Sequence, residues 1–150
     1  MQQQALSATV AWVRLDAAIQ SFNQMLRRDF GITGLQLSVL RILGERPALP
    51  LAALRKALVM HAATLGQSID ELRVMGLCAV TRDPRDKRAR QVAITEAGKE
   101  LMARVPVAGP MRLRETENDP ARLDRLKFAF DDAIELFGLA DYVPGKTAGR

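Results

Sequence analysis

One short stretch gathers most of the side chains that could do chemistry. DPRDKR, residues 83–88, places Arg85, Lys87 and Arg88 between two runs of alternating apolar residues. From Arg73 to Arg90 there are six basic residues against two acidic ones. Grouped guanidinium and ammonium ions attract polyanions such as nucleic acid, with steep salt dependence. The chemistry indicated is anion binding, although a merely solvated surface would have the same composition.

The elements around this stretch form a strand pair. CAVTR (78–82) and RQVAI (90–94) alternate enough to be strands, and DPRDKRA (83–89) between them holds turn formers and charges. The pattern predicts a hairpin with an extended, charged tip.

Helical periodicity covers most of the remaining chain. Gly31 and Gly76 provide stop signals, whereas Thr33, Thr95 and Asp119 are suitable N-caps. ERPALP (45–50) reads as a turn because it holds two prolines. The predicted helices cover about 5–29, 33–43, 51–58, 62–75, 96 to a break at Pro106–Pro110, and 120–137, before a flexible tail at 138–150.

The order of elements defines the expected fold class. It is mainly α with a small β-hairpin wing (α+β), a winged helix-turn-helix with N- and C-terminal dimerisation helices. In this geometry the second helix of the turn pair enters the DNA major groove. The hairpin reaches the neighbouring backbone or the narrower minor groove, where arginine and lysine are attracted.

Composition limits the class of protein. The chain has 150 residues, which suits one domain, and 48% are hydrophobic. No run of 18 apolar residues exists, and no leader pattern precedes a cleavage site. The single cysteine, Cys78, precludes an internal disulfide framework and agrees with a reducing compartment. We expect a cytoplasmic protein that has no membrane partner and needs no cofactor.

The motifs together resemble the MarR family of transcriptional regulators. DPRDKR is similar to that family's wing signature, and it runs into AITEAGKEL (93–101), which is similar to the opening of its next helix. The upstream segments GITGLQLSVLRIL (31–43), PLAALRKAL (50–58) and TLGQSIDELRVMGL (64–77) resemble its second, third and recognition helices. The resemblance covers about residues 5–137.

The resemblance implies a regulator that binds DNA as a homodimer. Helices at about 5–29 and 96–137 would interlock between two chains, flanking a DNA-binding lobe at about 30–95. The two lobes would read a palindrome with half-sites about 34–36 Å apart. A repressor relieved by a small ligand, such as an aromatic or phenolic acid, is the implied mechanism.

The same resemblance nominates individual residues. Arg88 would enter the minor groove; the alternatives are a solvated surface arginine or a salt bridge to Asp86 or Asp83. Arg85 and Lys87 would contact phosphates or simply carry surface charge. Candidate DNA contacts on the recognition helix are His61, Ala63, Thr64, Gln67 and Ser68. Trp12 and Phe22 could line a ligand pocket, or they could pack in the dimer core.

The chain also departs from the family pattern. Many members carry Thr-Arg where this chain has Gly66-Gln67, and a basic residue where it has Val80. Gly66 either permits close approach to DNA or only weakens the helix. The Pro106–Pro110 break falls where the fifth helix of the family continues, which puts a standard half-site spacing in doubt. Cys78 reads as a small buried hydrophobe in preference to an oxidant sensor.

Two other classes of protein were weighed. An enzyme lacks support, because there is no Gly-rich phosphate loop and no cysteine–histidine metal spacing. Because His61 is the single histidine, a metal site built from histidines is excluded. A winged-helix protein-interaction or dimerisation module, with weak or lost specific DNA binding, is the stronger alternative.

Overall fold

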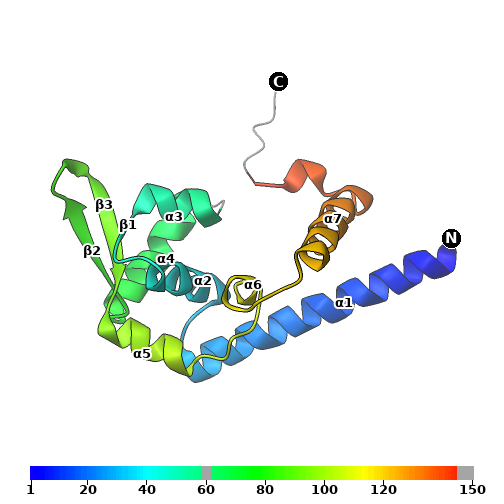
Figure 1. Ribbon diagram of the computed structural model, residues 1–150, viewed down its shortest axis with the longest axis horizontal. Coiled ribbons are helices and arrows are strands. Elements are labelled where there is room, and N and C mark those ends of the chain that lie inside the picture. The colour runs from blue at the N-terminus through cyan, green and yellow to red at the C-terminus, as the bar shows by residue number, and fades with distance from the viewer. Residues whose placement is uncertain (59–61, 145–150) are drawn as a thin grey trace.

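The computed structural model describes residues 1–58 and 62–144, and it confirms a mainly helical winged-helix fold (Figure 1). The element order matches the predicted one except for an added strand and two short helices. The helices are α1 (Gln2–Met25), α2 (Gly34–Gly44), α3 (Leu51–Leu58), α4 (Ala62–Val74), α5 (Glu96–Arg104), α6 (Arg112–Glu115) and α7 (Pro120–Leu136). The strands are β1 (Leu49–Pro50), β2 (Cys78–Asp83) and β3 (Asp86–Ile94).

The junction between α1 and α2 is built from three local signals. The last turns of the first predicted helix open into a π-helix, η1 (Leu26–Phe30), which ends at Gly31 with φ 70°. Thr33 then caps α2: its Oγ1 accepts from the Gln36 N–H at 3.1 Å, and Gln36 Oε1 accepts from the Thr33 N–H at 2.9 Å. This reciprocal capping box fixes the angle at which the chain enters α2.

β2 and β3 form the predicted hairpin, and a third strand that was not predicted, β1, adds to it. β1 pairs antiparallel with β3, and the order is β1-β3-β2. The prolines of ERPALP suggested a turn, but Pro50 sits at the sheet edge, where a missing N–H is tolerated. Leu49 is buried and opposite Val92, which explains why this short segment pairs.

The hairpin tip is tighter than predicted. β3 begins at Asp86, which is opposite Asp83, so only Pro84 and Arg85 separate the strands. Charged residues were expected to keep 83–89 out of the ladder. Side chains on an exposed two-stranded ribbon remain in water, so their charge does not prevent backbone pairing.

The hydrophobic core belongs to the lobe formed by α2, α3, α4 and the sheet. Leu40, Leu43, Leu54, Leu72 and Val92 have no exposed surface. By contrast, neither α1 nor α7 contains a buried residue. Figure 1 shows α1 extending away from the lobe with α7 above it, and the Trp12 and Phe137 rings meet edge to face at 5.9 Å.

The segment after α5 breaks as its prolines predict. α5 ends at Arg104, and a seven-residue link (105–111) leads to the four-residue α6. Asp119 caps α7 by accepting the Ala121 N–H at 3.1 Å.

The chain from 138 onward was expected to be a flexible tail, and its first residues have turn and helical geometry. Ala140–Tyr142 form a 3-10 helix, and the Leu139 N–H donates to the Ile134 carbonyl at 2.9 Å. Positions 145–150 of that prediction lie outside the described residues. No helix in the described part of the chain is both long and apolar enough to cross a bilayer.

Two glycines make a matched stability test. A Cβ at Gly98 would clash with the Leu77 carbonyl and lie 2.6 Å from Ile94 Cγ1, whereas one at Gly66 would meet nothing within 4 Å. Gly98→Ala should lower the free energy of unfolding by about 1–3 kcal/mol through overpacking. Gly66→Ala should raise it by about 0.5–1 kcal/mol by removing a flexible residue from a helix. Urea denaturation measures both, and equal effects of the two substitutions would contradict the packing shown.

Candidate nucleic-acid interface

The wing presents its basic side chains to solvent. Arg85, Lys87 and Arg88 are all exposed. Asp83 Oδ1 accepts the Arg85 N–H at 2.9 Å, and Asp86 Oδ1 accepts the Arg88 N–H at 3.0 Å. The two carboxylates therefore shape the backbone of the turn, as Asp commonly does two residues before an N–H. No ion pair between described residues involves the three cations, so the alternative in which Arg88 forms a salt bridge with Asp83 or Asp86 is not observed.

Three arginines from two elements meet at the base of the wing. Arg55 of α3 and Arg88 and Arg90 of β3 line a cleft of about 330 Å³ that also touches Leu65 of α4. β1 makes this possible, because its pairing with β3 holds the start of α3 against that strand. Sequence reasoning had counted Arg90 only in the basic patch. Its spacing of two from Arg88 places both on one face of the strand, a signal that could have been used.

The recognition-helix candidates separate by exposure. Thr64 and Gln67 of α4 are exposed, and Ser68 is half-buried. Ala63 lies in the first turn of α4. His61 lies outside the described residues. Thr64 and Gln67 are therefore exposed on one helix, α4, which belongs to the same lobe as the wing.

A polar network fixes α4 against the start of α2, and sequence reasoning missed it. Gln36 is 2% exposed, and its Nε2 donates to Glu71 Oε2 at 2.7 Å. The other oxygen of Glu71 accepts from Gln67 Nε2 at 3.4 Å. A buried amide is costly unless it is hydrogen-bonded, so this contact favours one orientation of α4. The capping-box pattern at Thr33 hinted at the role of Gln36 but not at its partner on α4.

The two aromatic candidates for ligand binding occupy different places. Phe22 lines a pocket between α1, α2 and the link before α6. Trp12 does not line that pocket; its ring contacts Phe137, the C-cap residue of α7. Within residues 1–58 and 62–144 no three histidine, cysteine or acidic side chains gather as a metal site requires.

Comparison with known proteins agrees with the motif reading. Residues 32–89 match the MarR family model. The transcriptional regulator HosA of Escherichia coli O111:H- is 33% identical over 72 residues, which cover 48% of this chain and 53% of HosA. The match therefore spans about half the length of this curated relative.

Solved structures support the same fold. Sco3205, a MarR family regulator from Streptomyces coelicolor solved in complex with DNA, gives a TM-score of 0.70 at 19% identity, covering 90% of this chain and 88% of that one. BpsR from Bordetella bronchiseptica, whose DNA binding is regulated by 6-hydroxynicotinic acid, gives 0.57 at 26% identity, covering 82% and 97%. These findings confirm the resemblance to the MarR family and its winged-helix fold.

Cys78 offers a simple chemical test of burial. It is 3% exposed, its thiol lies 3.7 Å from the Ile69 carbonyl, and burial raises the pKa of the thiol above its ordinary value. A higher pKa leaves less thiolate, the reactive form, at neutral pH. Iodoacetamide should therefore label the folded protein at least about tenfold more slowly than the protein in urea. Rapid labelling of the folded chain would instead favour the hypothesis that Cys78 senses oxidants.

Proposed function

We propose that this MarR-family chain is a dimeric, sequence-specific DNA-binding regulator of transcription, a cytoplasmic repressor relieved by a small ligand. One observation carries the proposal: Arg55, Arg88 and Arg90 converge at the wing base, beside a helix whose exposed side carries Thr64 and Gln67. Such a lobe suits a duplex, because Gln67 can pair with an adenine edge while the arginines take phosphates or the minor groove. Lys87 and Arg85 at the tip would add phosphate contacts.

Dimerisation is supported by two helices, α1 and α7, that bury none of their residues within the part of the chain that the structure describes. α1 has 24 residues, none buried, and exposes Leu6, Val10 and Val13 at helical spacing. α7 exposes Phe128 and Leu136 to 62% and 81%. A stripe of large apolar side chains on two such helices is an interaction surface. A second copy of the chain would bury it, and would place two lobes to read a palindrome.

The alternative function is a protein-interaction module that has lost specific DNA binding. Gln67, standing where many relatives have arginine, favours it. Val80 does not, because it is opposite Val92 and packs against the core, where its side chain is not available to DNA. The basic side chains of the wing, which form no ion pair with another described residue, favour the DNA-binding function.

Arg88→Ala tests the role of the wing. Loss of a hydrogen-bonded charge should weaken DNA binding about tenfold or more. It should also reduce the slope of log affinity against log salt by about one. Binding is measured by fluorescence anisotropy on a duplex first selected from a randomised pool by the wild-type protein. Lys99→Ala, which removes a cation paired with Glu96 on α5, is the matched control and should change little.

Two results would count against this assignment. Recovery of no sequence motif at low and moderate salt would favour the interaction module. Selection of a motif with unchanged affinity for the Arg88→Ala protein would keep the regulator but reject the wing contact.

Dimerisation is tested on the exposed stripe of α1. A double Val10→Asp and Val13→Asp variant would bury two uncompensated charges at the proposed interface, which is strongly unfavourable. Sedimentation velocity should show wild-type dimers and variant monomers at the same micromolar concentration. Gln4→Asp, at a polar position of the same helix, should remain dimeric. A monomeric wild-type protein would refute the assembly.

A further inference from the structure

Three side chains join the start of α2 to α4 in one chain of hydrogen bonds. Gln36 lies in the first turn of α2 and is 2% exposed, whereas Gln67 and Glu71 are exposed one turn apart on α4. All three line one cleft of about 1010 Å³ beside the junction of α1 and α2. The order of donors and acceptors along this chain decides which groups Gln67 can offer to a base.

The direction of the hydrogen bonds is fixed by a backbone N–H, which can only donate. The Thr33 N–H donates to Gln36 Oε1 at 2.9 Å, so the other end of that amide, Nε2, donates to Glu71 Oε2 at 2.7 Å. Both oxygens of an ionised carboxylate accept and neither donates. Gln67 must therefore turn its Nε2 toward Glu71 Oε1, and these two atoms are 3.4 Å apart.

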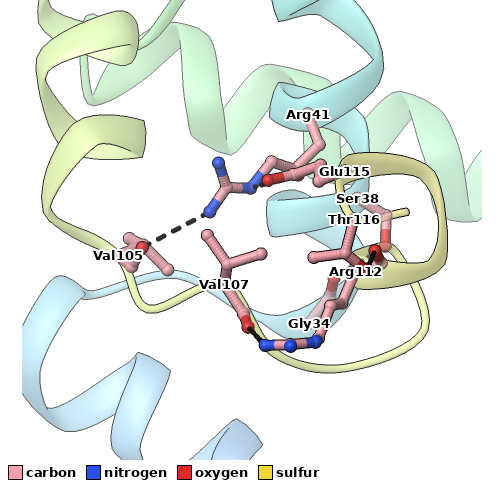
Figure 2. A network of polar contacts seen from close by, with 8 residues as sticks. All are labelled: Gly34, Ser38, Arg41, Val105, Val107, Arg112, Glu115 and Thr116. Atoms are coloured by element: carbon pink, nitrogen blue, oxygen red, sulfur yellow. Dashed lines mark hydrogen bonds and ion pairs between the residues drawn. The ribbon is translucent and has the colours of Figure 1, made fainter. Parts of the chain in front are cut away.

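α2 is a rigid support for this chain because it is also fastened further along, at Arg41. The Arg41 guanidinium donates to the Val105 carbonyl at 3.4 Å and pairs with Glu115 of α6 at 3.1 Å (Figure 2). The Arg41 side chain is only 14% exposed, so water screens these contacts less than it would at the surface. The helix that orients Glu71 is thus held in place within the protein itself.

One acceptor and one donor remain free on the Gln67 amide. Among the described residues its Oε1 accepts no hydrogen bond, and its Nε2 uses one of two hydrogens on Glu71. In the major groove adenine presents N7 as an acceptor and its N6 amino group as a donor, whereas guanine presents two acceptors, N7 and O6. The free groups of Gln67 therefore complement adenine, whereas guanine would place one acceptor against another.

We propose that Glu71 is a positioning residue for base recognition, which holds the Gln67 amide in the orientation that selects adenine. The inference rests on the proposed function and names the residue that sets one of its base preferences. Glu71 acts through Gln67 and touches no base itself. Because a carboxylate near DNA is repelled by phosphate, this arrangement lowers affinity while it raises discrimination between bases.

Glu71→Gln tests the orientation with a substitution of the same shape. The oxygen of the new amide still accepts from Gln36 Nε2, so the buried contact is kept. Its NH2 group then faces Gln67, which must turn its carbonyl inward and present two N–H donors to the base. Two donors complement guanine N7 and O6, so the preference should shift from adenine toward guanine by about tenfold.

The preference is measured by selecting duplexes from a randomised pool with the full-length protein, followed by fluorescence anisotropy on the selected site. The base that Gln67 reads is the adenine whose enrichment is lost in the Gln67→Ala protein. Replacing this adenine with purine, which lacks the N6 amino group, should weaken wild-type binding about tenfold and leave Gln67→Ala binding unaltered. This comparison tests the amide orientation even where the Glu71→Gln protein is poorly folded.

Asp70→Asn is the matched control for charge. Asp70 is exposed next to Glu71, and it pairs with Arg73 at 3.7 Å instead of with Gln67. The substitution removes the same negative charge from α4, so it should change affinity for DNA of random sequence as Glu71→Gln does. It should nevertheless keep the adenine preference. The double variant Gln67→Ala, Glu71→Gln should lack a preference at this position, like Gln67→Ala alone.

The outcomes separate this inference from the proposed function. The regulator stands and the inference falls if Gln67→Ala changes no position of the motif, if wild type binds adenine and purine equally, or if Glu71→Gln keeps the adenine preference. A shift toward guanine in the Asp70→Asn protein would assign the effect to charge, and one that persists in the double variant would mean that residue 71 itself contacts the base. Either result overturns the positioning role. Selection of no motif by the wild-type protein would reject the regulator and the inference together.

Discussion

The position of β3 as the central strand is the constraint on which the winged-helix lobe depends. Val92 is fully buried and is opposite both Leu49 of β1 and Val80 of β2. Fixing this end of β3 in the core lets its other end, from Asp86 to Arg90, project as an exposed ribbon. The β1 pairing also holds α3 beside β3, so that Arg55 meets Arg88 and Arg90. A hydrophobic contact in the sheet thus determines where positive charge gathers.

The distribution of buried side chains divides the molecule into two parts that differ in how they are stabilised. The lobe has its own core, whereas α1 and α7 together contribute no buried side chain. Isolated helices gain little stability in water without tertiary packing. The charge is divided in a similar way, since residues 115–141 hold eight acidic against three basic residues, while 73–90 are basic. An acidic surface around α7 would be repelled by DNA, which favours an arrangement with the wings toward DNA and α7 away from it.

The helix ends, which depend on interactions between residues close in sequence, could be predicted from the sequence. The capping residues Thr33, Thr95 and Asp119, the stop at Gly31 and the proline break all lie where they were expected. Features that depend on a residue far along the chain could not be predicted. Leu49 forms a strand because it pairs with Val92. The hairpin pairing continues to Asp86 although the residues there are charged. The wing cations could be named in advance, but not their convergence with Arg55. The Gln36–Glu71 contact joins positions 35 residues apart, so no local pattern reveals it.

The link between α5 and α7 is where the two parts of the chain can influence one another. Arg41 and Glu45 of the α2 region pair with Glu115 and Arg114 of α6, so the approach to α7 is fastened to the helix that also carries Gln36. From Gln36 the hydrogen bonds continue through Glu71 to Gln67 on α4. α2 is therefore a shared support for α6 at one end and for α4 at the other. A displacement of α6 against α2 would therefore act through this support on α4, the helix that carries Thr64 and Gln67.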